Sequence, residues 1–242
     1  MRKALKFITF VSLFLLMMSE VFAYQLSPLS VTFSPSGVES TKAYTITNDS
    51  DSAIAIEMKV YKRFVDADGN EYTEEAPQYF SIQPTKMIIK PQSTQIVRVQ
   101  YRGPKTVTKE MSFRIVSEQI AYSQGATVTE GNQMINFLFV YGTAAYVKPT
   151  KVVESVTGSA VLSDGKINLT LANTGSVHQV LNDLKITIFS GDKSYELTEE
   201  ELKGLSGINL LTDSKLVKTI ECPEFMGGTS GYRVEVEYDY NY

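Results

Sequence analysis

Histidine, cysteine and tryptophan are almost missing from this chain of 242 residues, which has one histidine, one cysteine and no tryptophan. His178 alone cannot supply the ligands of the usual zinc sites, and it weakens any proposal of a Ser-His-Asp triad. Cys222 alone cannot form a disulfide within the chain, so burial of apolar side chains must hold the fold together. We interpret His178 as a structural residue rather than a catalytic one, and Cys222 as a buried, inert thiol rather than a reactive one.

Phosphate-binding and metal-binding motifs are missing as well. No glycine-rich phosphate loop occurs, and acidic runs such as residues 199–201 lie in polar segments typical of a solvated surface. Residues 66–71 resemble the start of a calcium loop, but Glu71 stands where that loop needs glycine and Pro77 where it needs its last glutamate. We interpret this segment as a hairpin turn. The sequence therefore predicts no metal, no cofactor and no enzyme activity.

Excess positive charge and long apolar runs are scarce except at the N-terminus. The formal net charge of −4 argues against nucleic acid as a partner, because nucleic acid demands a basic face. A basic start is followed by the apolar residues 7–18 and by small residues that end at Ala23, which is the layout of a signal peptide covering residues 1–23. An uncleaved anchor is the alternative. We expect a mature exported protein that begins at Tyr24 and does not insert into the membrane, because no later run reaches the ~20 apolar residues of a span.

The rest of the chain reads as β-strand nearly throughout. Short segments rich in β-branched and aromatic residues alternate with turn-forming residues. These segments are residues 31–33, 43–47, 54–61, 95–101, 113–116, 167–171, 184–189 and 233–238. The pattern predicts an all-β protein with two immunoglobulin-like β-sandwich domains in tandem. We place the domains at residues 24–149 and 150–242, because Pro149 ends a long strand and the strand pattern then restarts.

One helical turn is predicted in the second domain, within residues 198–205. Thr198 and Glu201 have the spacing of a capping box, in which each side chain bonds the other residue's backbone N–H. Gly204 then suits the C-terminal end of the turn, because glycine adopts the left-handed conformation found there without a steric cost.

One long segment, residues 134–141, is apolar on both faces. Ile135, Phe137, Phe139 and Tyr141 alternate with a second set of mostly apolar residues. A strand of this kind must be covered on both faces. Two interpretations stay open: a central strand buried between two sheets, or an edge strand whose second face is covered by a partner, since an exposed apolar edge invites aggregation.

Several segments resemble the periplasmic pilus (fimbrial) assembly chaperones of the chaperone–usher pathway. The resemblance covers the mature chain and is most specific in the first domain. The segments that carry it are residues 45–48, 80–84, 89–93, 95–99, 110–115 and 146–149, with weaker similarity at residues 169–175 and 184–186. The stretch from Phe80 to Val99 is the most recognisable part, since two prolines there lead into a strand bearing an arginine.

The resemblance implies two immunoglobulin-like domains set at an angle, in the periplasm. It implies donor-strand complementation, in which the chaperone lends a long strand to a pilus subunit whose own sandwich lacks one. By position, Ile135, Phe137 and Phe139 are the lent side chains, with Tyr141 next in register. Delivery to an outer-membrane usher follows, and no cofactor is implied. Glu110 and Lys148 fall where the family has an interdomain salt bridge.

The chain departs from the family at one important site. Classical members bind the C-terminal carboxylate of the subunit with an arginine on the first strand and a lysine on the long strand. Ser30 and Ala144 stand at those positions, and neither side chain can make a charge-assisted bond to a carboxylate. We therefore expect a divergent branch, in which Arg102 or Arg114 is a candidate substitute.

Other functions stay open at this level. The first rival is an exported immunoglobulin-like adhesin or glycan-binding module, which would hide residues 135–141 inside a closed sandwich. The second is a periplasmic hydrolase, although the sequence offers no nucleophile–base pair. A self-capping homo-oligomer of the free chaperone is a further expectation for the partner that covers the strand.

Overall fold

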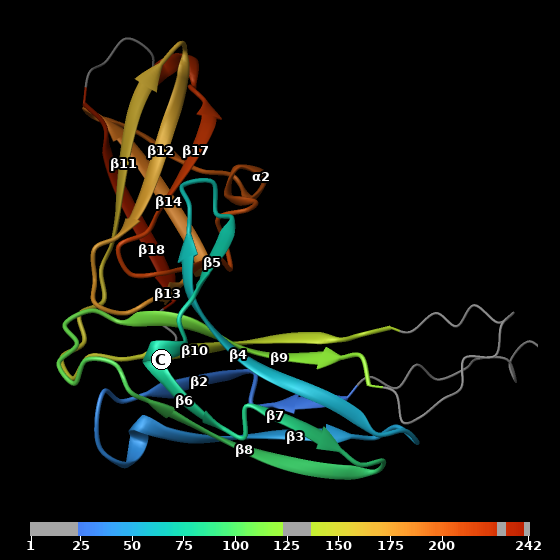
Figure 1. The fold of residues 1–242 in the computed structure, drawn as a ribbon. Coiled ribbons are helices and arrows are strands. Elements are labelled where there is room, and N and C mark those ends of the chain that lie inside the picture. Colours follow the sequence, from blue (N-terminus) through green and yellow to red (C-terminus); the bar gives the residue numbers. More distant parts are fainter. Residues whose placement is uncertain (1–23, 123–136, 227–230, 240–242) are drawn as a thin grey trace, which may run out of the picture.

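The computed structural model describes residues 24–122, 137–226 and 231–239. The expected signal peptide at residues 1–23 lies outside the described residues, as does Ile135. The described residues form two β-sandwich domains in tandem, set at an angle (Figure 1). The strands of the first domain run across Figure 1, and those of the second stand nearly upright above them. The predicted fold class, two immunoglobulin-like domains in tandem, is confirmed.

Two sheets make the first domain. One has the strand order β1-β3-β8-β6 and the other β2-β10-β9-β4-β5, with β7 also paired to β4. The strands are β1 (Gln25–Ser27), β2 (Ser30–Phe33), β3 (Thr41–Asn48), β4 (Ile54–Val65), β5 (Glu71–Glu75), β6 (Phe80–Gln83), β7 (Lys86–Ile89), β8 (Ser93–Tyr101), β9 (Met111–Ile120) and β10 (Val140–Val147). Two short 3-10 turns, η1 (Val38–Ser40) and η2 (Pro77–Tyr79), connect them.

The second domain has three smaller sheets, with the orders β11-β12-β17, β13-β16 and β15-β14-β18. Its strands are β11 (Val156–Ser163), β12 (Lys166–Asn173), β13 (Gln179–Val180), β14 (Asn182–Ser190), β15 (Lys193–Glu196), β16 (Asn209–Leu210), β17 (Lys215–Glu221) and β18 (Arg233–Asp239). Its short helices are α2 (Glu199–Leu202) and the 3-10 turn η3 (Glu224–Met226).

Each domain has its own hydrophobic core, because the strands alternate inward apolar residues with outward polar ones. The first core lies between its two sheets and includes the fully buried Tyr44, Phe33 and Phe113. The second core includes the fully buried Leu169 and Ile186. The first cluster contains residues from Tyr24 to Val147 and the second those from Ala160 to Tyr238. The exact boundary at Pro149 stays a prediction.

The helical turn predicted within residues 198–205 is confirmed as α2. Thr198 and Glu201 form the predicted capping box, and Gly204, just beyond the helix, has a φ of +82°. The prediction of a buried Cys222 is wrong in part, because the residue is only partly buried at the rim of the second core. The reason is its position directly after β17, where the chain leaves the sandwich.

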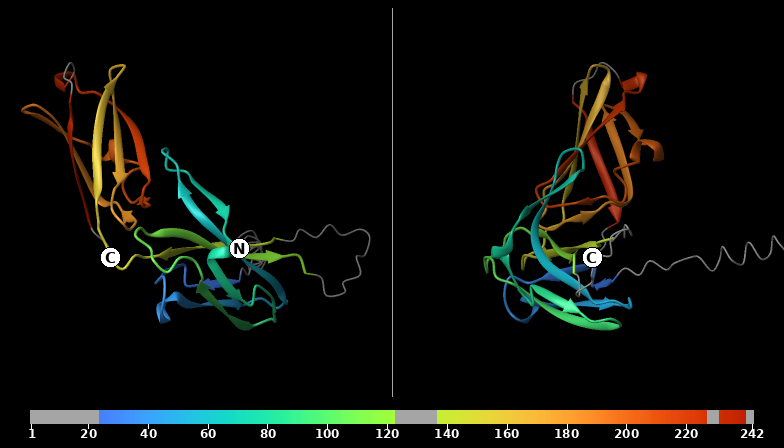
Figure 2. Two further views of the ribbon diagram at one scale, coloured as in Figure 1. Left: turned by 60° about the vertical axis from the view of Figure 1, so that its left-hand side comes forward. Right: turned by 45° about the vertical axis from the view of Figure 1, so that its right-hand side comes forward.

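The hairpin of β4 and β5 reaches the second domain, as Figure 2 shows most clearly in its left view. Residues 66–70 form its turn, which confirms the predicted hairpin. The backbone N–H of Val217 in β17 donates to the carbonyl of Ala67 at 2.8 Å. A side chain built at Gly69, whose φ is +86°, would lie 3.3 Å from the side chain of Leu216. The turn is therefore attached to the second domain.

Among the described residues, no helix is long and apolar enough to cross a membrane. The same residues contain no group of three or more His, Cys, Asp and Glu side chains able to hold a metal ion.

Candidate functional site

Strand β10 has different neighbours along its length. All of it, Val140–Val147, pairs with β9, whereas only the residues from Ala144 to Val147 also pair with β2. Within the part of the chain that the structure describes, residues 140–143 pair with β9 alone. We call residues 140–143 the open half of β10 and residues 144–147 its closed half.

Among the described residues, the backbone groups of the open half have no strand partner on the β2 side. The N–H of Ala144 donates to the carbonyl of Leu29, next to β2, at 2.8 Å, and the carbonyl of Phe139 accepts from the N–H of Gln119 in β9 at 2.9 Å. Backbone groups alternate in direction along a strand, so those of Val140 and Gly142 point the same way as those of Ala144. This edge has the geometry for pairing with a further strand.

Apolar side chains surround this edge. Phe137, Leu138 and Val140 are 68%, 50% and 61% exposed. Phe139 and Tyr141 are partly buried and pack against the first core. Of the predicted lent side chains, therefore, Phe137 is exposed, Phe139 and Tyr141 lie at the end of the core, and Ile135 is outside the described residues.

The strand begins later than the apolar pattern suggests. That pattern predicts strand over residues 134–141, but in the described part β10 starts at Val140 and continues to Val147. Pairing with β9 decides these limits, and the small residues from Gly142 to Ala145 have no apolar pattern that would reveal it. The predicted strand end before Pro149 is confirmed.

Tyr24 packs under the open half. Its ring meets the ring of Tyr141 edge to face, with 4.7 Å between the centroids. The Tyr24 hydroxyl donates to the carbonyl of Ser117 at 2.7 Å. Burial raises the pKa of Tyr24 to about 12, so this tyrosine stays neutral at physiological pH. The two rings form an aromatic layer beneath the open half.

The two positions assigned to the family's carboxylate site lie side by side. Ser30 in β2 and Ala144 in β10 are register partners, and Arg114 in β9 is the partner of Ala144 on its other side. A side chain built at Gly142 would lie 3.9 Å from Cδ of Arg114. Arg102, in contrast, follows β8 in the other sheet, where its backbone N–H donates to Tyr79. Of the two candidate substitutes, only Arg114 therefore lies in the row of Ser30 and Ala144.

Arg114 belongs to a cluster of charges. Its Nε donates to Oε1 of Glu71 at 2.7 Å and its Nη2 to Oε2 at 2.6 Å. Arg63 donates from Nε to Oε2 of Glu71 at 2.7 Å and from Nη1 to the hydroxyl of Tyr146 at 3.2 Å. Asn209 of the second domain donates to the same hydroxyl at 2.7 Å. The hydrogen bonds from Arg114 hold the pKa of Glu71 below its ordinary value of 4.5.

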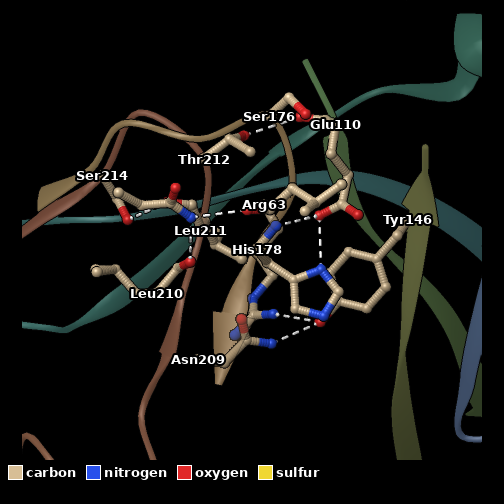
Figure 3. Close-up of polar contacts among 12 residues, drawn as sticks. Arg63, Glu110, Tyr146, Ser176, His178, Asn209, Leu210, Leu211, Thr212 and Ser214 are labelled. Carbon is tan, nitrogen blue, oxygen red and sulfur yellow. Dashed lines mark hydrogen bonds and ion pairs between the residues drawn. The ribbon is translucent and has the colours of Figure 1, made fainter. Parts of the chain in front are cut away.

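Glu110 joins the two domains (Figure 3). Its carboxylate is buried, accepts from the backbone N–H of His178 at 3.1 Å, and lies 2.7 Å from Nδ1 of the same residue. The His178 ring stacks on Tyr146 with 4.0 Å between the centroids. The backbone N–H of Glu110 donates to the carbonyl of Ser176, and the hydroxyl of Thr212 donates to the carbonyl of Glu110. These contacts fix the closed half of β10 beneath the second domain.

Sequence reasoning missed part of this network. The predicted ion pair between Glu110 and Lys148 is not tested by the contact with His178 and stays a prediction. His178 has the structural role expected of it, but nothing in the sequence assigned Glu110 as its partner. Arg63 and Glu71 flank the predicted hairpin turn, which is the one signal that could have paired them.

A cavity of about 320 Å³ lies on the interface of the two domains. It is lined by the end of β4 (residues 62–65), the start of β9 (residues 109–112) and residues 211–214 of the second domain. Lys109 forms an ion pair with Asp213 across this interface. The interface is therefore incompletely filled and combines charged side chains with apolar ones.

Known proteins share both the sequence pattern and the fold of this chain. Residues 25–152 match the model of the pili and flagellar-assembly chaperones, PapD N-terminal domain. No curated protein matches the chain in sequence. Similar solved structures include the class 5 fimbriae chaperone CfaA, which has a TM-score of 0.59 at 13% identity. The match covers 90% of this chain and 100% of CfaA.

Two further similar structures are complexes. One is a chaperone–tip adhesin complex of CFA/I fimbriae biogenesis, with a TM-score of 0.59 at 12% identity, covering 84% of this chain and 91% of that one. The other is the CsuC–CsuE chaperone–tip adhesion subunit pre-assembly complex of Acinetobacter baumannii, with a TM-score of 0.53 at 14% identity, covering 82% and 91%. At such identities the structures establish the fold alone, whereas the family model spans more than half of the chain. The chain therefore belongs to the family of pilus-assembly chaperones whose first domain is the PapD N-terminal domain.

Proposed function

We propose that this chaperone binds a pilus subunit by pairing the open half of β10 with an edge of the subunit, and then delivers it to an outer-membrane usher. The observation that carries the proposal is the open edge at Val140 and Gly142, next to the exposed Phe137. Pairing of this kind is β-augmentation, in which main-chain hydrogen bonds join the edges and alternate side chains fill pockets. The two adhesin complexes of similar fold support a pilus subunit as the partner.

The lent side chains are Ile135, Phe137 and Phe139, with Tyr141 next in register. Phe139 and Tyr141 alternate in step with the buried Thr143, Ala145 and Val147, so these positions continue the core-facing side of the sheet. A subunit that extends this sheet receives them in its own core. Full burial of each such side chain is worth roughly 1.5–3 kcal/mol, less the cost of ordering the segment.

We further propose that Arg114 binds the C-terminal carboxylate of the subunit, in place of the residues missing at Ser30 and Ala144. Arg114 is the register partner of Ala144, which in turn pairs with Ser30. An arginine recognises a carboxylate with two parallel hydrogen bonds. Its side chain is 24% exposed, so solvent reaches it.

This function requires export to the periplasm, which the signal peptide at residues 1–23 would provide. The free chaperone must also protect the open half of β10 from aggregation, and self-association of two copies is the simplest way to cover it. The open edge favours a chaperone over the rival adhesin or glycan-binding module, which would close it within its own sandwich.

The test is a pull-down of the mature chain from periplasm, with mass spectrometry of the captured proteins. Phe137→Glu should lose a captured β-rich pilus subunit without losing stability, because the side chain is exposed. Val161→Glu is the matched control, since Val161 is 63% exposed on β11 of the second domain and far from β10 in the chain. Equal capture by the wild type and both variants would refute the proposal, and so would unfolding of Phe137→Glu.

A further inference from the structure

The guanidinium edge that Arg114 would offer to a subunit is already occupied. Its Nε and Nη2 each donate to one oxygen of Glu71, at 2.7 and 2.6 Å, which is the two-bond geometry of an arginine–carboxylate pair. Such an edge holds one carboxylate at a time. A second carboxylate can bind there in the same way only after Glu71 has left.

We infer that Glu71 is an internal competitor for the carboxylate of the subunit, so that only a ligand that also pairs with β10 displaces it. This inference rests on the proposed role of Arg114. It assigns Glu71 a selective role: the residue excludes free carboxylates and short peptides from the site while no subunit strand is present.

The contacts of Arg63 make the exchange feasible. Arg63 is only 10% exposed, and its position is fixed by its hydrogen bonds to Glu71 and to the hydroxyl of Tyr146. Glu71 can therefore keep Arg63 as its partner while Arg114 turns to the incoming carboxylate. Two arginines then pair with two carboxylates, and no charge is left without a partner.

Glu71 is attached to the site through the β4–β5 hairpin, and this attachment explains why free carboxylates and short peptides do not displace it from Arg114. Glu71 begins β5, directly after the turn whose Ala67 carbonyl accepts from Val217 of the second domain. A carboxylate held in this way competes at an effective concentration in the millimolar range or above, without the cost of free association. A separate molecule must supply additional binding, and strand pairing along the open half of β10 provides it.

The experiment follows the arginine Nε–H signals of the isotope-labelled mature chain by NMR. The probes are N-acetylglycine, which ends in a carboxylate, and N-acetylglycinamide, which does not. In Glu71→Gln, N-acetylglycine should shift the Arg114 signal and bind at least about 10-fold more tightly than in the wild type, and the amide should bind to neither. Glu74→Gln is the matched control, because it removes the same charge from the opposite face of β5, and it should behave like the wild type.

Equal affinity of the wild type and Glu71→Gln for N-acetylglycine would overturn the inference, as would an Arg114 signal that does not respond in the variant. Should Glu71→Gln fail to fold, Glu71→Asp keeps the charge but shortens the reach, and it should bind the probe about 3-fold more tightly than the wild type. The probe carries no strand, so the titration is independent of subunit capture. Capture that does not depend on Phe137 would refute the proposed function and leave this result standing.

Discussion

The two halves of β10 share one backbone and one partner strand, yet they lie in different environments. The core-facing side chains are fully buried in both halves, at Thr143, Ala145 and Val147, whereas the outward-facing ones differ: Tyr146 in the closed half is 4% exposed. In the open half, Val140 is 61% exposed. Tyr146 is covered by His178 and Asn209 of the second domain. The backbone edge differs as well, because β2 pairs with β10 only from Ala144 onward. A short neighbouring strand thus leaves one strand with a half whose backbone edge is paired on both sides and a half whose edge is open among the described residues.

The largest expected effect is the difference in stability between two variants that place a carboxylate on β10, one in each half. Ala145→Glu would bury a carboxylate without a partner in the first core, and we expect a loss of at least about 3 kcal/mol in the free energy of unfolding, or no folding at all. Val140→Glu should change it by less than about 0.5 kcal/mol, because the side chain lies in solvent. Urea unfolding of both variants measures the difference. Similar values for the two would show that the core-facing position of the closed half and the outward-facing position of the open half do not differ as described.

Hydrogen exchange should reveal the same contrast without substitution. The amides of Val140 and Gly142 point to the open edge, whereas that of Ala144 donates to Leu29. We expect the first two to exchange at least about 100-fold faster than Ala144, since exposed, unpaired amides need no opening of the structure. Addition of a captured subunit should slow Val140 and Gly142 and leave Ala144 unchanged. Equal rates in the free chain would mean that something covers the open edge.

The sequence could predict the chemical character of this strand but not its limits. The alternation of Phe137, Phe139 and Tyr141 marks the segment correctly as apolar on both faces, and it allows two interpretations, a buried central strand and an edge strand. In the described part of the segment, Val140 and Tyr141 lie beyond the start of the pairing with β2, which is a property of tertiary pairing, and the partner that would cover the second face stays a prediction. The small residues from Gly142 to Ala145 carry no periodic apolar signal.

The polar part of the site was harder to predict. Arg114 is a candidate because of its charge, but its position beside Ala144 follows from the register of β9 against β10. Arg102 has the same charge and lies in the other sheet. Glu71 and Arg63 lie near Arg114 because β5, β4 and β9 are neighbours in one sheet, with Tyr61 of β4 paired to Arg114. The contact of Arg114 with Glu71 spans 43 residues of the chain, and local patterns in the sequence do not encode it.

The smallest expected effect is on the free energy of unfolding and concerns the ion pair of Glu71 and Arg114, next to Ala144. Hydrogen bonds from Arg114, beside Ala144, lower the pKa of Glu71 below 4.5. A lowered carboxyl pKa contributes stability that is fully present above pH 4.5 and is lost as the pH falls through the lowered value. We therefore expect the wild type to exceed Glu71→Gln in stability by less than about 1 kcal/mol at pH 7, since the pair is partly exposed.

Urea unfolding of the wild type and Glu71→Gln between pH 7 and pH 3 measures this effect, because other titrating groups cancel in the difference between the two chains. The difference should be constant above pH 4.5, shrink below it, and also shrink at high salt, where exposed charges are screened. A difference that persists unchanged at pH 3 would mean that Glu71 stabilises the hairpin through packing rather than through its charge. Arg114 would then be held less firmly than its two hydrogen bonds indicate, and the edge next to the open half of β10 would be easier for a subunit to enter.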